Sequence, residues 1–164
     1  WKYDRLAESA LGACPMRTGT KAWEGQLLSA FDLYAGHFLA MEAEEAWMLA
    51  PRVRWKTRFE RIVAALSSHF QHGKRFDEAV NICQRALEMD PLNEVHYRRL
   101  MSCYLELGET AAVARTYANC RYVLAKSLDA QPSYETERIQ RMALERGHLS
   151  VRRLNSAEST GCAS

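Results

Sequence analysis

A helical-hairpin pattern that occurs twice constrains this chain more than any other feature. Each copy combines an apolar stripe at helical spacing, a glycine after the first helix, and small residues on the partner helix. Gly108 follows Gly73 by 35 residues, and Ala114 follows Ala79 by the same interval. Such a hairpin buries its apolar face only by packing on its neighbours. The pattern therefore predicts an all-α scaffold that presents a surface.

The first copy is predicted to span residues 52–89 and the second residues 92–128. Gly73 and Gly108 are expected to end the first helix of each copy in a left-handed conformation. The first helix of the first hairpin has apolar residues at Trp55, Phe59, Ile62, Val63, Leu66 and Phe70. The inward-facing residues of its partner helix are Ala79, Ile82, Cys83, Ala86 and Leu87. In the second hairpin, the apolar residues of the first helix are Tyr97, Leu100, Met101 and Tyr104. The inward-facing residues of its partner helix are Ala114, Tyr117, Ala118 and Leu124. Asp90 is expected to cap the helix of the second copy, with Pro91 at its first position.

Further helices are predicted on both sides of the two copies, so that one helical domain covers residues 1–145. Residues 1–50 carry one apolar pattern at Leu6, Ala10 and Leu11 and another at Trp23, Leu27, Ala30, Phe31 and Tyr34. The second of these helices is expected to end at Gly36, and residues 14–20 read as the loop between the two. A capping helix is predicted over residues 133–145, with the Ser133 hydroxyl at its start. Residues 146–164 are expected to form a disordered tail.

Composition narrows the functional classes. With 164 residues and 48% hydrophobic residues, the chain can build a core. A net charge of +2 is too small to indicate nucleic-acid binding by the whole surface. No run approaches the roughly 18 apolar residues of a membrane span. The five cysteines form no C-x-x-C pair, which favours reduced thiols in a cytoplasmic protein. Because the chain begins at Trp1 and not at Met, we expect it to be part of a longer polypeptide.

No pattern in the sequence predicts catalysis, a cofactor or a metal site. His69 and His72 have the spacing of a ligand pair, but further ligands at a recognisable spacing are missing. Glu44 and Glu45 are adjacent, so their side chains diverge on a helix. The basic residues Arg52 to Arg61 alternate with the apolar stripe, as on a solvated helix face, and no recognition-helix signature accompanies them.

Three stretches resemble the bacterial transcriptional activator domain (BTAD), the helical domain of SARP-type regulators, whose fold is like that of tetratricopeptide (TPR) repeats. They are Leu33-Tyr34-x-Gly36-x-Phe38-Leu39 with Glu44-Glu45-x-Trp47; Phe76-x-Glu78-Ala79 through Ala86-Leu87-x-x-Asp90-Pro91-Leu92; and Leu107-Gly108 with Tyr117, Arg121, Leu128, Pro132, Ser133, Glu135 and Thr136. The resemblance covers roughly residues 1–143 and implies a TPR-like stack of antiparallel helical hairpins, an α-α superhelix. The repeat interval is also close to the roughly 34 residues of a TPR unit.

The chain departs from this family in three places. Pro51 falls where the family usually continues a long helix, so we expect a kink or a new helix start there. Tyr134 stands where a proline is common, which changes little. The winged-helix DNA-binding domain that usually precedes the module is absent from these residues. Any DNA contact is therefore expected only through a domain outside this chain.

The resemblance implies a non-catalytic regulatory role through protein–protein contact. The partners would be a second copy in a possible homodimer, other domains of the parent regulator (DNA-binding or sensor), or the transcription machinery, with no membrane partner. Transferring the TPR register predicts a binding groove at Arg61, Ala64, Ser68, Arg98 and Ser102. Ala64 and Ser68 occupy two positions of the carboxylate clamp of chaperone-binding TPR domains, so that clamp is not expected. Two alternatives stay open: a TPR adaptor that binds a peptide outside transcription, and an effector-binding sensor.

Overall fold

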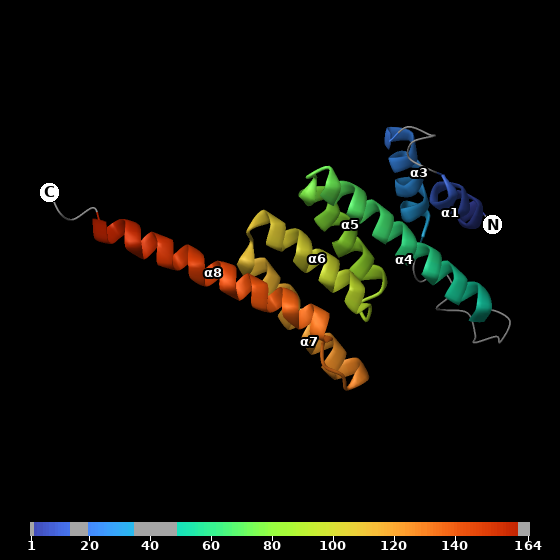
Figure 1. Cartoon of the computed structure of the whole chain (residues 1–164). Coiled ribbons are helices and arrows are strands. Elements are labelled where there is room, and N and C mark those ends of the chain that lie inside the picture. The colour runs from blue at the N-terminus through green and yellow to red at the C-terminus, as the bar shows by residue number, and fades with distance from the viewer. Residues whose placement is uncertain (1, 14–19, 35–48, 161–164) are drawn as a thin grey trace. The chain divides into compact units, whose positions relative to one another are not determined.

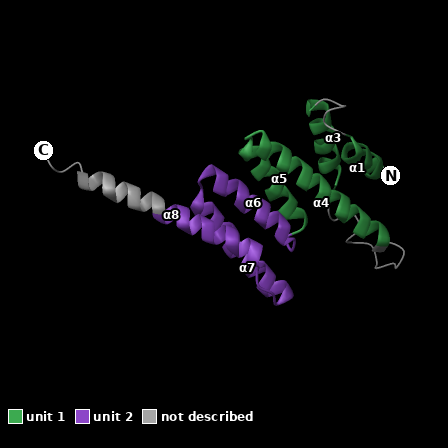
Figure 2. Ribbon diagram, viewed as in Figure 1, with its two compact units in different colours: residues 1–90 green, residues 91–164 purple. Residues whose placement is uncertain are grey.

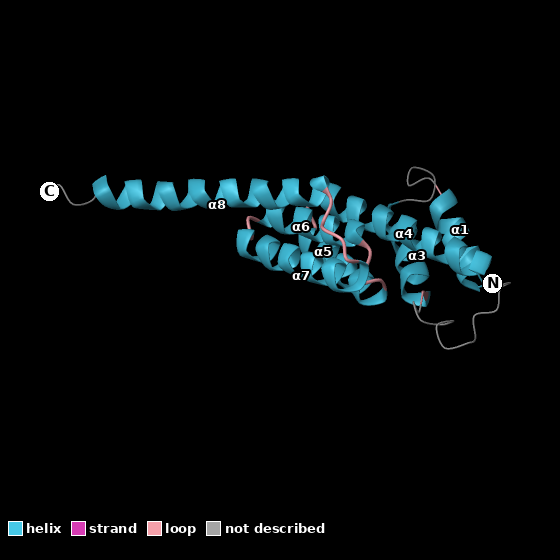
Figure 3. Cartoon of the chain, turned by 90° about the horizontal axis from the view of Figure 1, so that it is seen from below, coloured by secondary structure: helices cyan, strands magenta, loops and turns pink. Residues whose placement is uncertain are grey.

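The chain is described by a computed structural model that covers residues 2–13, 20–34 and 49–160, with side chains to His148. These residues form seven helices and no strands (Figures 1 and 3). The helices are α1 (Lys2–Gly12), α3 (Thr20–Leu33), α4 (Leu49–His72), α5 (Phe76–Met89), α6 (Glu94–Leu107), α7 (Thr110–Leu128) and α8 (Tyr134–Thr160). The prediction of an all-α fold is confirmed.

The helices divide between two compact units, unit 1 over Trp1–Asp90 and unit 2 over Pro91–Ser164 (Figure 2). In unit 1, α4 and α5 pack together as the first hairpin, and α1 and α3 pack on each other and on α4. In unit 2, α6 and α7 form the second hairpin, and α8 packs on both of them. Each unit therefore buries the apolar face of its hairpin under additional helices.

The core of unit 1 follows the predicted apolar stripe of α4. Five residues of this stripe are buried: Phe59, Ile62, Val63, Leu66 and Phe70. The Phe59 ring stacks on Tyr34 and Phe31, with centroid distances of 4.0 and 5.3 Å, and so attaches α3 to α4. On α5, Ala79 and Ala86 are fully buried, which allows the two helices of the hairpin to approach closely. The predicted packing of the first hairpin is confirmed, apart from Trp55 and Leu87, which are half-buried.

The second hairpin has a different register from the one predicted. On α6, Leu100 and Met101 are buried as expected, but on α7 Ala118 is exposed and Ala114 is half-buried. The buried residues of α7 are Ala112, Val113, Cys120 and Leu124. Val113 forms a core cluster with Met101 of α6 and Ala143 of α8. Since Val113 takes the place that Ala79 has in the first hairpin, the repeat interval is 34 residues and the interval of 35 was wrong.

The turn after α4 explains this shift. Gly73 was predicted to be left-handed, but the residue with positive φ is Lys74, at 56°. The same conformation follows α6 at Gly108, at a φ of 78°, as predicted. Both turns close with the same backbone bond, from Arg75 N–H to Phe70 O (2.8 Å) and from Glu109 N–H to Tyr104 O (2.9 Å). The two glycines therefore occupy different positions of the turn, and the left-handed residues are the ones that show the true interval.

Lys74→Gly should stabilise the chain by about 0.5–1 kcal/mol, because a Cβ strains the left-handed conformation and glycine does not. Urea unfolding of the wild type and the variant would measure the difference. Lys74→Ala is the matched control, since it removes the charged side chain but keeps the Cβ. An equal gain in both variants would show that the lysine side chain, and not the backbone conformation, causes the strain.

Several helix ends differ from prediction. Asp90 does not cap α6 but follows the last residue of α5. Its carboxylate forms an ion pair with Lys56, and Asp90 Oδ2 lies 2.8 Å from Lys56 Nζ. The N-cap of α6 is Asn93, whose side chain accepts a hydrogen bond of 3.1 Å from Val95 N–H. Asn93 takes this position because Pro91 and its neighbour form a turn before the helix begins. Pro51 lies in the first described turn of α4, where its nitrogen needs no helical partner. The kink or new helix start stays a prediction, because residues 35–48 lie outside the described residues.

The two outer helical segments also have different bounds. Helix α8 begins at Tyr134, as predicted, but continues to Thr160. The predicted helix end at residue 145 was therefore wrong, and so was the prediction of disorder over residues 146–160. The segment contains no proline, and five of its fifteen residues are Arg or Leu, which tolerate a helix well. Helix α3 ends at Leu33, and the loop residues 14–19 and Gly36 lie outside the described residues.

Candidate functional site

Three of the five predicted groove residues lie along one face of α4. Arg61, Ala64 and Ser68 are spaced by three and four residues, so their side chains are neighbours on the helix surface. The buried stripe of α4 points toward α1, α3 and α5, so this face lies on the opposite side of α4 from the core of unit 1. Arg61 is exposed, and Ala64 and Ser68 are half-buried. The face thus combines a cation with two small side chains.

Arg61 also lines a pocket between α1 and α4. The pocket has a volume of about 200 Å³, and its walls are Glu8, Leu11, Gly12, Arg58 and Arg61. Arg58 forms an ion pair with Asp4 of α1, and Asp4 also accepts a hydrogen bond of 3.0 Å from Trp55 Nε1. These bonds connect α1 to α4 at Arg58, which also lines the pocket. Sequence reasoning did not find the pocket, because the contact joins segments about fifty residues apart.

The other two predicted groove residues, Arg98 and Ser102, lie on α6 in unit 2. Arg98 donates a hydrogen bond of 3.1 Å to the Ser133 hydroxyl, and the Ser102 hydroxyl donates one of 2.9 Å to the Arg98 carbonyl. Both side chains therefore form hydrogen bonds with residues of unit 2. The five residues belong to two units, so one continuous groove through all of them stays a prediction.

A polar network of unit 2 is centred on Glu94, which the sequence analysis did not single out. Its Oε1 accepts hydrogen bonds of 2.7 Å from both the backbone N–H and the hydroxyl of Ser133. The buried Thr136 hydroxyl donates to the same oxygen. Arg98 lies 3.7 Å from this carboxylate. The network attaches the first turn of α8 to the first turn of α6, and it explains the Pro132-Ser133-x-x-Thr136 pattern in the sequence.

The Ser133 hydroxyl therefore does not cap α8 as predicted, but donates to Glu94. The Ser133 carbonyl accepts the N–H groups of Thr136 and Glu137 instead, at 3.0 and 3.1 Å. Burial alone would raise the pKa of Glu94, but the hydrogen bonds from Ser133 and Thr136, with the charge of Arg98, outweigh it and lower that pKa. Nearby, burial raises the pKa of the Cys120 thiol to about 12, so the thiolate that a nucleophile needs is not formed.

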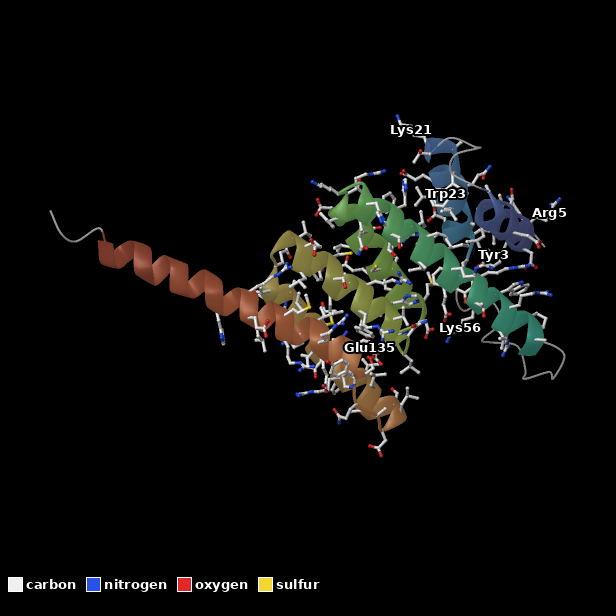
Figure 4. All side chains as sticks on the ribbon, viewed as in Figure 1. Tyr3, Arg5, Lys21, Trp23, Lys56 and Glu135 are labelled. Atoms are coloured by element: carbon white, nitrogen blue, oxygen red, sulfur yellow. The ribbon has the colours of Figure 1, made fainter. Side chains whose placement is uncertain are left out.

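The two histidines considered as a metal pair have separate contacts. His69 Nε2 lies 3.0 Å from Glu24 Oε2, and its ring meets Trp23 edge-on at 5.3 Å (Figure 4 labels Trp23). His72 Nδ1 lies 2.6 Å from the Ser68 carbonyl oxygen. Among the described residues, no three side chains of the metal-binding types come together. Glu44 and Glu45 lie outside those residues.

The described cysteines behave as predicted for small buried residues. Cys83, Cys103 and Cys120 are free thiols and fully buried. Cys14 and Cys162 lie outside the described residues. Among the described helices, none is both long enough and apolar enough to span a membrane.

Antiparallel helical hairpins of this kind, each packed against further helices of its own unit, are typical of TPR-like helical domains. Within that class, the family model of the bacterial transcriptional activator domain matches residues 5–144, and the chain belongs to this family. The chain is therefore a helical domain of the transcriptional-regulator type. No curated protein and no solved structure matches it.

Proposed function

We propose that the chain is a non-catalytic protein-interaction module of a bacterial transcriptional regulator and acts in the cytoplasm. It mediates self-association, or docking to a DNA-binding domain, a sensor domain or the transcription machinery. DNA contact belongs to a domain outside this chain. Family membership over residues 5–144 supports the regulatory role. The mechanism is positional, since a rigid helical surface brings a partner to a defined place.

The face of α4 at Arg61, Ala64 and Ser68, which lies opposite the buried stripe, is the observation that carries this proposal. Arg61 is exposed there, and the small side chains of Ala64 and Ser68 let a partner approach the helix backbone closely. This face is not needed to bury the core, because the apolar stripe of α4 lies on its other side. Arg98 and Ser102 are engaged within unit 2, so we place the main contact on α4.

A bacterial reporter tests the proposal with the full chain. The chain is fused to an unrelated DNA-binding domain whose site lies upstream of a weak promoter. Contact with the transcription machinery should raise reporter expression with this fusion alone. Self-association should raise it when a second copy is fused to a polymerase subunit. Arg61→Glu combined with Ser68→Trp should remove the increase, because the two changes reverse the charge and block close approach.

Lys21→Glu is the matched control, because Lys21 is an exposed cation at the start of α3, away from the α4 face (Figure 4). It should leave the increase intact, and circular dichroism should show equal helicity in all variants. Basal expression in both arms, together with a monomer in sedimentation equilibrium, would overturn the proposed role. An increase that Arg61→Glu with Ser68→Trp leaves unchanged would overturn the assignment to α4.

A further inference from the structure

Two arginines line the pocket between α1 and α4, and among the described residues only one of them, Arg58, has an acidic partner. Arg58 is neutralised by Asp4 and lies 3.8 Å from Glu8. Arg61 forms no ion pair with any residue of the described segments. Its guanidinium is exposed and lies at the pocket wall. An unpaired arginine can bind a carboxylate by donating two parallel hydrogen bonds to it.

The surface around the pocket is also basic. Arg54 lies two turns before Arg61 on the same face of α4 and is exposed. Arg5 is exposed on α1, the other wall of the pocket (Figure 4). The carboxylates that contact Arg58 are Asp4, which also accepts a hydrogen bond from Trp55, and Glu8, which is largely exposed. The charge of this face is therefore complementary to an acidic partner.

We propose that this pocket receives an acidic side chain of a partner protein, whose segment lies along the α4 face over Ala64 and Ser68. The inference rests on the proposed function, since it names the chemistry of the partner at the same face. A polypeptide fits better than a nucleic-acid backbone for two reasons. Leu11 provides an apolar wall that a phosphate does not need. The small side chains of Ala64 and Ser68, on the same face of α4 as Arg61, leave room for a peptide backbone. Arg61 donates the charge-assisted hydrogen bonds to the acidic side chain. Arg58 forms a wall of the pocket and is held in place by its ion pair with Asp4.

Titration of the full chain with a short poly-L-glutamate peptide at low salt tests this assignment. The amide signals of Leu11, Gly12 and Arg61 should shift, because they line or flank the pocket. Arg61→Glu should weaken the affinity by about tenfold or more, since it places like charges together. Glu8→Gln should strengthen it by about two- to threefold by removing an exposed competing carboxylate. Lys21→Glu should leave the affinity within about twofold of the wild type.

Two results would overturn the inference. One is binding of the peptide without shifts at the three pocket amides. The other is tighter binding of a short DNA duplex than of the peptide, with shifts of the same three amide signals. That result would indicate that the partner is a nucleic acid bound through its phosphates. Neither result depends on the reporter assay of the proposed function. Reporter activation that survives Arg61→Glu alone, without pocket shifts, would leave the interaction module standing and remove only the acidic partner.

Discussion

Replacing Ala79 with tryptophan should lower the free energy of unfolding by about 3 kcal/mol or more, at the upper end of what overpacking costs. Ala79 is fully buried on α5, where it faces α4. The larger side chain cannot fit without separating the two helices of the first hairpin. Urea unfolding followed by circular dichroism would measure the change, and a lower midpoint with an unchanged slope would indicate lost stability of the same fold.

Ala118→Trp is the matched control on the second hairpin. An interval of 35 residues would place Ala118 at the position of the buried Cys83, whereas the structure places it on the exposed side of α7. The substitution should therefore change the stability by no more than about 0.5 kcal/mol. Severe destabilisation by Ala118→Trp, with a tolerated Ala79→Trp, would contradict the interval of 34 residues.

Replacing Glu94 with alanine should cost about 2–3 kcal/mol, because it leaves the Ser133 and Thr136 donors at the start of α8 without their charged acceptor on α6. Hydrogen exchange should increase first in the N-terminal turns of α8, which this carboxylate attaches to α6. Glu106→Ala is the control, since Glu106 is an exposed residue of the same helix. Equal losses from both variants would contradict a specific role of the network.

The same carboxylate should make stability depend on pH. The pKa of Glu94 is lower in the folded chain than its ordinary value of 4.5, so the contribution of Glu94 to stability is fully present above that ordinary value. The contribution is lost as the pH falls through the folded pKa, because the carboxylate must then take up a proton. The stability difference between the wild type and Glu94→Gln should therefore shrink on acidification from pH 7 toward that pKa. A difference that stays constant would show that Glu94 does not titrate in this range.

The fold was largely predictable because each hairpin repeats a simple helical pattern. Phe59, Leu66 and Phe70 stand at helical spacing, and a helix with such a stripe must bury it. The turn after α4 was not predictable in detail. Gly73 is the residue that usually takes a left-handed conformation, yet Lys74 takes it. A shift of one residue in that turn was enough to misplace Ala118 on the partner helix of the second hairpin.

The candidate site was predictable only in part. The face at Arg61 and Ser68 follows from the helical period, since it lies away from the apolar stripe of the same helix. Glu94 escaped notice because an acidic residue near a helix N-terminus is common and has an ordinary explanation in the helix dipole. Its partners, Ser133 and Thr136, lie about forty residues away.

Local regularities of the chain account for its helices, for the pairing of α4 with α5 and of α6 with α7, and for membership in the bacterial transcriptional activator domain family. These properties depend on the spacing of apolar and small residues over one or two helical turns. Contacts between distant segments account for the rest: the attachment of α8 through Glu94, and the pocket that Arg58 and Asp4 support between α1 and α4. A polar side chain has several possible partners along the sequence, and only the packed helices select one of them.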